Sequence, residues 1–362
     1  MLDMKLFSDI YRGRRVLLTG HTGFKGSWLA LWLHEMGAEV TGVALAPEGV
    51  PNHWDLLQVP LDERRCDIRD AGALAAIVKG AQPELVFHLA AQSLVRRSYR
   101  KPLETWSTNV MGTANVLDAC RQESSVRAIV VVTTDKCYEN REWPWPYREI
   151  DHLGGHDPYS ASKAAAELVA ASFRSAFFSG GAAPLVATAR AGNVIGGGDW
   201  SEDRLIPDLI RAMEREQSVE IRSSQASRPW QHVLDCLSGY LVLGQKLLTG
   251  EKAYAEAWNF GPEPVDSCTV AEVLDKLRRH WRSLRWHVST QSHPHETTLL
   301  CLDSAKARAR LGWRCVWPLD TTLEKTAAWY QAWLNKGEVI SRQQLTEYIA
   351  AAAEAGLGWT NV

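Results

Sequence analysis

Two short groups of residues have the types and spacing for proton-transfer chemistry. Thr134, Asp135 and Lys136 follow the apolar run 128–132, which is typical of a buried strand. Tyr159 and Lys163 are four residues apart, so they share one face of an expected helix. A lysine ammonium beside a phenol favours the phenolate, so we expect Tyr159 to act as a base well below its free pKa of about 10. The sequence therefore predicts two proton-transfer devices in one site, more than a simple dehydrogenase requires.

Asp135 and Lys136 make opposite demands if they act as an acid and a base. A lysine base must be neutral, but its ordinary pKa is about 10.4 and a neighbouring carboxylate raises it further. A cationic lysine in turn opposes the protonation that Asp135 needs in order to act as an acid. Two interpretations stay open: the pair shares one proton in a dry site, or Lys136 only positions the substrate while another group is the base.

A glycine-rich turn near the N-terminus predicts a cofactor site. Residues 20–26, with the sequence Gly-His-Thr-Gly-Phe-Lys-Gly, follow an expected strand at 15–19 and open an expected helix at 24–36. Glycines let the backbone approach a pyrophosphate, and the helix N-terminus supplies N–H donors and partial positive charge. The residues expected to contact a dinucleotide here are Gly20, Thr22, Gly23, Phe24 and Gly26.

The second and third strands bear on the choice of cofactor. The expected strand 39–45 ends with neither an acid for an adenosine ribose nor a basic residue for a 2′-phosphate. We favour NAD over NADP. Asp67 and Ile68, after a weak third strand at 61–66, either border the adenine or form a turn.

The fourth strand, expected at 85–89, ends in small residues. Ala90 and Ala91 leave room for a cofactor to lie across the sheet, although close helix packing would use the same residues. His88 is expected to be structural. Tyr159 and Lys163 complete the expected cofactor contacts.

Later segments supply candidates for substrate contacts. Asn193 lies in a glycine-rich connection that is alternatively only a turn, and Arg228 has the planar fork that suits a diphosphate. The expected substrate-binding residues are Ser93, Asn193, Arg228, Asn259 and Glu296. His293, His295 and Glu296 lack further ligands at sensible spacing, so no metal is expected.

The alternation of strands and helices predicts the fold. Further expected elements are helices at 71–80, 104–121 and 160–178 and strands at 128–134 and 184–191. Such alternation indicates βαβ units and an α/β fold with a doubly wound, Rossmann-like parallel sheet. Later, shorter elements, with a helix at 270–280, indicate a smaller mixed α/β lobe. We expect residues 1–192 to be mainly the NAD-binding domain and residues 193–362 mainly the substrate-binding lobe, with some chain crossing back.

Composition argues against several classes of protein. The 362 residues carry a formal net charge of −2, which indicates no nucleic-acid or membrane-surface partner. No apolar run reaches about 18 residues, and residues 1–15 lack the apolar core of a signal peptide. The seven cysteines form no C-x-x-C pair, which fits a reducing, cytoplasmic location rather than a disulfide framework.

Residues 14–329 resemble the extended short-chain dehydrogenase/reductase family. Within it, residues 19–28, 133–138 and 228–233 look like the nucleotide-sugar 4,6-dehydratases of the CDP-sugar branch. The related dTDP- and GDP-sugar enzymes usually have Glu after the Asp, where this chain has Lys136. The alternatives are a 4-epimerase or dehydrogenase, in which the corresponding segment lacks the acid/base pair, and a non-catalytic NAD-binding protein, which has no use for the Tyr–Lys pair.

The resemblance implies a role for each of these residues, with a CDP-sugar as substrate and NAD as cofactor. Tyr159 would deprotonate the sugar 4-hydroxyl as C4 passes a hydride to NAD, Thr134 would hydrogen-bond that oxygen, and Lys163 would bind the nicotinamide ribose. Lys136 would then remove the C5 proton and Asp135 would protonate the departing 6-hydroxyl before the hydride returns to C6. The product would be a 4-keto-6-deoxy sugar nucleotide for deoxysugar biosynthesis. Relatives assemble through the helix that carries the Tyr–Lys pair, so a homodimer or homotetramer is expected.

Overall fold

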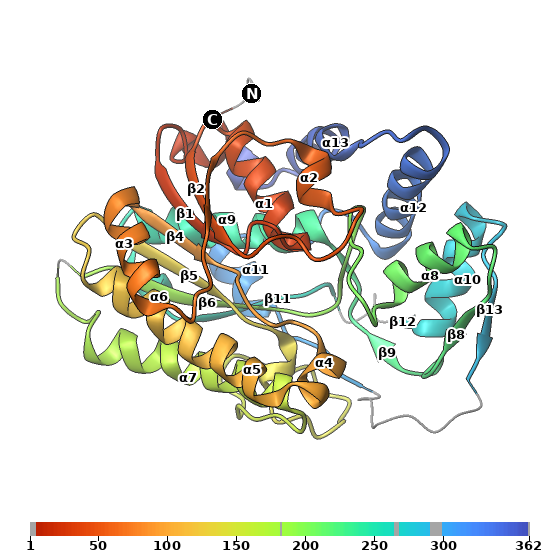
Figure 1. The fold of residues 1–362 in the computed structure, drawn as a ribbon, viewed down its shortest axis with the longest axis horizontal. Coiled ribbons are helices and arrows are strands. Elements are labelled where there is room, and N and C mark those ends of the chain that lie inside the picture. The colour runs from red at the N-terminus through yellow and green to blue at the C-terminus, as the bar shows by residue number, and fades with distance from the viewer. Residues whose placement is uncertain (1–4, 182, 264–267, 290–298, 361–362) are drawn as a thin grey trace.

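A seven-stranded parallel sheet forms the centre of the computed structural model, which describes residues 5–181, 183–263, 268–289 and 299–360 (Figure 1). The strand order is β11-β6-β5-β4-β1-β2-β3, and every neighbouring pair is parallel. The strands are β1 (Arg15–Thr19), β2 (Glu39–Ala44), β3 (Asp62–Arg65), β4 (Leu85–His88), β5 (Ala128–Val132), β6 (Leu185–Ala191) and β11 (Ala257–Phe260). The order reverses between β1 and β4, where open α/β sheets bind ligands. The expected doubly wound fold is confirmed.

Helices cover both faces of this sheet, as Figure 1 shows. In β1, Val16 and Leu18 belong to one buried cluster and Leu17 to the other, because successive strand residues point to opposite faces. The first cluster includes α1 (Phe24–Glu35) and α9 (Val233–Leu248), and the second includes α3 (Ala71–Ala81), α6 (Gly112–Arg121) and α7 (Pro158–Ala176). Burial on both sides explains why the central strands are continuous apolar runs.

Two elements differ from the sequence-based expectation. The helix expected at 104–121 is divided into α5 (Pro102–Trp106), a π-helical turn η2 (Ser107–Met111) and α6. In that turn, the buried Asn109 accepts a hydrogen bond from Gln92 N (2.8 Å) and donates one to Ser162 Oγ (2.9 Å). The strand expected at 128–134 ends at Val132, so Thr133 and Thr134 already belong to the connection.

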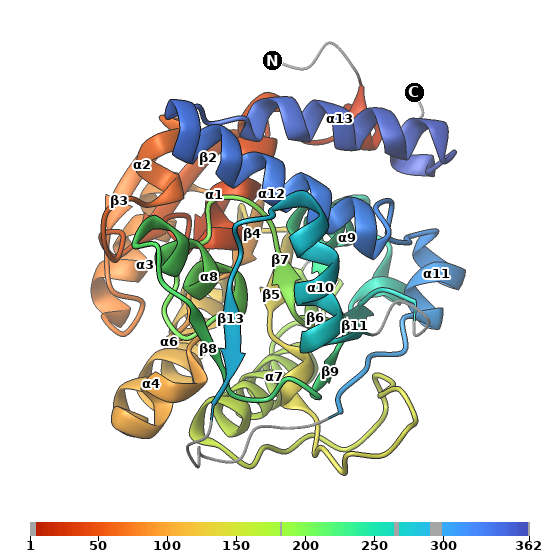
Figure 2. The ribbon, with the colours of Figure 1, turned by 90° about the vertical axis from the view of Figure 1, so that its right-hand side faces the viewer.

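The later part of the chain forms a smaller mixed lobe, seen on the right of Figure 1 and facing the viewer in Figure 2. Its paired strands are β7 (Val194–Ile195) with β10 (Gln231–His232), β8 (Val219–Ile221) with β13 (Trp286–Val288), and β9 (Ser227–Arg228) with β12 (Cys268–Thr269). Its helices are α8 (Leu205–Glu214), α10 (Val270–His280) and α12 (Leu319–Lys336). Strand β11 returns to the large sheet, where Asn259 pairs with Arg190. The division near residue 193 stays a prediction.

The remaining elements are short or peripheral. They are η1 (Leu6–Asp9), α2 (His53–Leu57), α4 (Val95–Arg100), η3 (Asp135–Cys137), η4 (Lys252–Tyr254), α11 (Ala305–Leu311), α13 (Ser341–Glu354) and η6 (Gly358–Thr360). Helix α13 packs against α1, so the end of the described chain also returns to the first lobe. Within the described ranges, no helix combines the length and the apolar character needed to cross a bilayer.

Candidate active site

A cavity of about 970 Å³ lies between the carboxyl ends of the central strands and the smaller lobe. It brings together most of the residues predicted from sequence. Those that line it are Gly20, Thr22, Gly23, Phe24, Gly26, Asp67, Ile68, Ala90, Ala91, Ser93, Thr134, Asp135, Lys136, Tyr159, Lys163, Asn193 and Arg228. The predicted cofactor, catalytic and substrate groups therefore share one continuous space.

One predicted substrate residue that the structure describes, Asn259, is not part of this lining. Asn259 is fully buried in β11, where its amide donates to the carbonyl oxygens of Tyr147 (2.8 Å) and Asp303 (3.1 Å). Its Oδ1 accepts a hydrogen bond from Tyr138 Oη at 2.7 Å. With its amide bound inside the protein, a direct substrate contact by Asn259 has no structural support. Glu296 lies outside the described residues.

The glycine-rich turn between β1 and α1 has the geometry of a phosphate cradle. Gly20 has φ of +78°, and a Cβ there would lie 2.7 Å from Ala90 N. A Cβ on Gly26 would lie 2.0 Å from the Gly20 carbonyl oxygen, so the helix approaches the turn too closely for any side chain. Gly23 precedes α1 and offers no side-chain cap, which leaves the first helical N–H groups for an anion. These features fit a dinucleotide pyrophosphate.

Asp67 lies in a turn and also lines the cavity. It lines the cavity after β3, and its carboxylate also accepts a hydrogen bond from Arg69 N at 2.9 Å. The Arg69 guanidinium bonds to it at 2.5 Å and holds the pKa of Asp67 below its usual value. The turn and a place beside the cavity are therefore compatible, and a contact with the adenine stays a prediction.

Helix α7 presents Tyr159 and Lys163 in its first turns. Pro158 occupies the first helical position, and the Asp157 carboxylate caps the helix by accepting from Ser160 N at 3.0 Å. Lys163 is buried and its Nζ donates to the Val132 carbonyl oxygen at 3.2 Å. The helix start thus fixes both side chains against the end of β5.

The electrostatics of the Tyr–Lys pair differ from the expectation. Burial raises the pKa of Tyr159 to about 12, while a hydrogen bond with Thr134 and the charge of Arg204 act in the opposite direction. The Lys163 side chain donates to a backbone carbonyl oxygen, that of Val132. Burial, followed by the charge of Lys25, lowers the pKa of Lys163 itself to about 8. Desolvation outweighs the expected lysine effect on the phenol.

The turn after β5 holds the second pair of groups. Thr134 Oγ1 donates to Asp135 Oδ1 at 2.9 Å and accepts from Lys136 N at 3.3 Å. Asp135 is 2% exposed, and its Oδ2 has no hydrogen-bond partner within the described part of the chain. The charge of Asp135 also raises the pKa of Tyr159, so the Asp135–Lys136 and Tyr159–Lys163 pairs interact electrostatically. One carboxylate oxygen thus remains available beside the cavity.

His88 has the structural role expected for it. Its ring lies within 2.7 Å of Thr19 Oγ1 and 3.1 Å of Thr113 Oγ1, which links β1, β4 and α6. Burial lowers its pKa to about 3, so the ring is neutral at physiological pH.

Two cavity residues that influence the Tyr–Lys pair were not singled out in the sequence. Arg204 pairs with Asp199 at 3.1 Å and influences Tyr159, but it lies in a loop with no recognisable pattern. Lys25 lies 3.5 Å from Tyr240 Oη and influences Lys163. Its place inside the glycine-rich turn is the signal that could have identified it.

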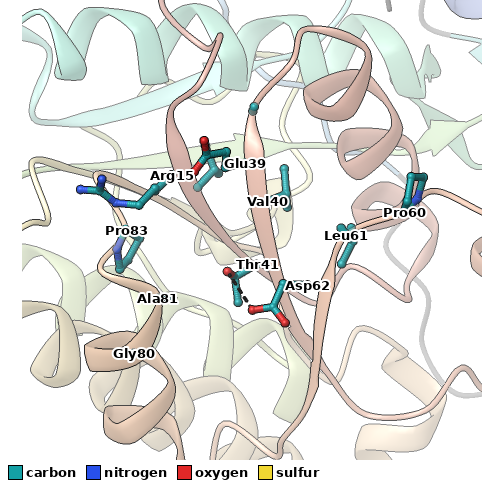
Figure 3. A pocket seen from close by; sticks show the side chains of 12 residues that line it. Arg15, Glu39, Val40, Thr41, Pro60, Leu61, Asp62, Gly80, Ala81 and Pro83 are labelled. Atoms are coloured by element: carbon teal, nitrogen blue, oxygen red, sulfur yellow. Dashed lines mark hydrogen bonds between the residues drawn. The ribbon is translucent and has the colours of Figure 1, made fainter.

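A second, smaller hollow of about 430 Å³ lies at the opposite ends of the strands (Figure 3). It is lined by the beginnings of β1, β2 and β3, including Arg15, Glu39 and Asp62. Thr41 Oγ1 donates to Asp62 there at 3.5 Å. None of the predicted site residues within the described ranges lines it.

Residues 17–326 match the family model described as GDP-mannose 4,6 dehydratase, and the chain belongs to this family. It is 47% identical over 352 residues to the CDP-glucose 4,6-dehydratase of Salmonella typhimurium, covering 95% of this chain and 98% of that one. The structure of MoeE5 in complex with UDP-glucuronic acid and NAD is similar, with a TM-score of 0.74, 27% identity and coverage of 89% and 99%. So is TunA, described as an NAD-dependent NDP-hexosamine 5,6-dehydratase, with a TM-score of 0.73, 25% identity and coverage of 88% and 97%. The resemblance stated from the sequence is confirmed.

Proposed function

We propose that this protein is an NAD-dependent CDP-glucose 4,6-dehydratase, a hydro-lyase that converts CDP-D-glucose to CDP-4-dehydro-6-deoxy-D-glucose and water. The observation that carries this proposal is the placement of Asp135 and Lys136 in one cavity with Tyr159 and Lys163. The likeness to the Salmonella CDP-glucose 4,6-dehydratase supports cytosine as the base.

The cavity lining supports NAD as the cofactor. The glycine-rich turn and the uncapped start of α1 suit its pyrophosphate, and Asp67, Ile68, Ala90 and Ala91 line the same space. When bound, NAD supplies an acceptor for the hydride from C4 and returns that hydride to C6. Lys163 is the proposed donor to the nicotinamide ribose.

The first half of the reaction is an oxidation at C4. Tyr159 takes the proton of the 4-hydroxyl, and Thr134 holds the oxygen through its hydroxyl. Thr134 and Tyr159 both line the cavity, and Thr134 lowers the pKa of Tyr159, so we propose that the two groups act on the same sugar oxygen. The resulting ketone makes the neighbouring C5 proton acidic.

The second half removes water and restores the oxidation level. Lys136 takes the C5 proton, and Asp135 gives a proton to the 6-hydroxyl, which leaves as water. A hydride then adds to C6 and a proton to C5, so the sugar has lost one water with no net redox change. The alternative in which Lys136 only positions the sugar stays open, and a Lys136 variant distinguishes the two.

The substrate's remaining groups are assigned to the other cavity residues. Arg228, which is 8% exposed, is the proposed partner of the diphosphate, and Ser93 and Asn193, which line the same cavity, are proposed to bind sugar and phosphate oxygens. Asn259 contributes indirectly, through Tyr138.

We further infer a homodimer. The elements α5, η2 and α7 contact one another, and each carries large apolar side chains that stay exposed. These side chains are Leu103, Trp106, Met111 and Leu168. Exposed apolar side chains on elements that contact one another are typical of a subunit interface. All seven cysteines are free thiols, which agrees with the cytoplasmic location that stays a prediction.

The test is incubation of the purified protein with CDP-glucose, with and without added NAD⁺. A product lighter by one water, with no net NADH, is expected. An epimer of unchanged mass, or NADH in proportion to substrate, would favour the epimerase or dehydrogenase alternative. Turnover of only dTDP- or GDP-sugars would keep the chemistry and reject cytosine.

A further inference from the structure

A third polar residue follows Tyr159 and Lys163 along the same face of α7. Glu167 is four residues beyond Lys163 and is 3% exposed. Its Oε1 accepts from Thr133 Oγ1 at 2.5 Å, and its Oε2 accepts from Thr188 Oγ1 at 2.7 Å. Thr133 directly precedes the turn 134–137, which carries Asp135 and Lys136. Glu167 therefore connects α7 to the start of that turn.

An arginine from β6 connects Glu167 to the other end of the turn. Arg190 Nη2 donates to Glu167 Oε2 at 2.8 Å, and its Nη1 donates to Tyr138 Oη at 2.7 Å. The guanidinium also lies 5.0 Å from the centroid of the Tyr138 ring, and Tyr138 donates onward to Asn259. Tyr138 directly follows η3, so the turn 134–137 is held on both sides by one buried ion pair.

The turn depends on this support because the hydrogen bonds that its backbone N–H groups donate within the turn are long. They measure 3.3 Å from Lys136 N to Thr134 Oγ1 and 3.4 Å from Cys137 N to the Thr134 carbonyl oxygen. A shorter bond, from Gly154 N to the Cys137 carbonyl oxygen at 2.9 Å, is a further tie. Tyr159, in contrast, belongs to a capped helix of 19 residues.

Stability alone does not explain a buried pair of this kind. Taking two charges out of water costs about as much as their attraction returns, so apolar residues of similar volume often serve as well. Burial favours neutral Glu167, yet Arg190 and the threonine hydroxyls outweigh it and hold the pKa of this carboxyl below its usual value. The carboxylate therefore stays charged and bonded at both oxygens.

We propose that Glu167 and Arg190 are positioning residues, which set Asp135 and Lys136 against the Tyr159–Lys163 pair for the elimination of water. This inference rests on the proposed dehydratase activity. Loosening the pair moves the turn more than it moves α7. The elimination half of the reaction should therefore slow more than the oxidation at C4.

Two isosteric variants isolate this effect. Thr133→Val and Thr188→Val each remove one hydroxyl that donates to Glu167, but only Thr133 adjoins the turn. In a rapid-quench time course with CDP-glucose, the 4-ketone that still carries its 6-hydroxyl should accumulate with Thr133→Val. The elimination rate should fall roughly tenfold or more, since small misplacements of catalytic groups have large effects. Thr188→Val should accumulate no more of this ketone than wild type does.

Glu167→Gln and Tyr138→Phe extend the test to the ion pair and its far end. In both variants, the 4-ketone that still carries its 6-hydroxyl should accumulate. Both should also slow deuterium incorporation at C5 from D₂O. Thermal melting checks that each variant folds. Suppose that wild type forms the dehydrated product, and that Thr133→Val accumulates no more of the 4-ketone with its 6-hydroxyl than Thr188→Val does. The positioning role is then rejected while the proposed function stands. If wild type forms no dehydrated product, the proposed function fails first and the inference with it.

Discussion

The backbone of Gly192 lies directly against the carboxylate of Asp135. A Cβ on Gly192 would be 2.9 Å from Asp135 Oδ2 and 3.0 Å from Pro229 Cγ. Oδ2 is the carboxylate oxygen that has no hydrogen-bond partner in the described ranges. The glycine after β6 therefore gives the proposed acid the space it occupies beside the cavity.

Gly192→Ala should reduce turnover with little loss of stability. The added methyl must displace the Asp135 carboxylate, and a misplacement of this kind lowers kcat by roughly tenfold or more. Steady-state kinetics with CDP-glucose measure the effect. The control is Gly80→Ala in α3, where an added Cβ meets nothing within 4 Å. Equal kcat values in the two variants would contradict the assignment.

Lys136→Met should abolish exchange of the C5 proton in a trapped 4-keto species. The methionine keeps most of the length of the side chain but has no nitrogen to accept the proton. NMR in D₂O follows the exchange, starting from CDP-4-keto-glucose. Exchange at the wild-type rate would remove Lys136 from the role of base and leave it as a positioning group.

Thr134→Val should shift the pH profile of oxidation to higher pH. The hydrogen bond with Thr134 lowers the pKa of Tyr159, which burial otherwise raises to about 12. Its loss raises the pKa of the phenol, so less phenolate is present at any given pH. The rising limb of kcat against pH should move upward, and Tyr159→Phe should lack it. An unmoved limb in Thr134→Val would show that this bond does not tune the base.

Asp235→Asn should remove a pH dependence of stability. Burial raises the pKa of Asp235 to about 7, although Val316 N (2.5 Å) and Tyr348 Oη (2.9 Å) donate to its Oδ1. The folded pKa exceeds the unfolded value of about 3.9, so this contribution to stability is complete below about pH 4 and is lost as pH rises through about 7.

The loss is at most about 4 kcal/mol, because each pKa unit corresponds to about 1.36 kcal/mol. Denaturant unfolding at a series of pH values gives the free energy of unfolding of both proteins. Between pH 4 and 7, wild type should lose stability relative to Asp235→Asn. Parallel profiles would mean that Asp235 titrates normally in the folded protein.

Charges on the apolar face of α5 and α7 should dissociate the inferred dimer. Leu103 and Leu168 are 82% and 60% exposed in the monomer, and glutamates there would be buried without partners in the dimer. Light scattering should report monomers for Leu103→Glu and Leu168→Glu. Ile150→Glu, at another exposed apolar residue, should match wild type. Monomeric wild type would reject the interface.

The dinucleotide half of the fold follows from local patterns in the sequence. The apolar run before Gly20, the glycine spacing and the helix signals at Asp157 and Pro158 each depend on neighbouring residues, so β1, α1 and α7 are predicted within a few residues. The grouping of Asp135 with Tyr159 follows because parallel strands place their carboxyl ends at one edge.

What the sequence did not predict depends on long-range contacts. Strand β11 has four residues, and nothing local shows that it pairs with β6. Consequently Asn259 was assigned to the substrate, whereas it supports Tyr138. The raised pKa of Tyr159 likewise reflects burial by several distant segments, which a four-residue spacing to Lys163 does not contain.

The position of β11 in the chain also affects how the nascent protein folds during its synthesis. Strand β6 is complete at Ala191, but its partner begins only at Ala257. Until that segment emerges, the nascent chain carries an unpaired edge strand, which is prone to pairing with other chains. The edge beside Arg190 is therefore the last part of the large sheet to close, and a chain that ends before residue 257 would carry an open, aggregation-prone sheet edge.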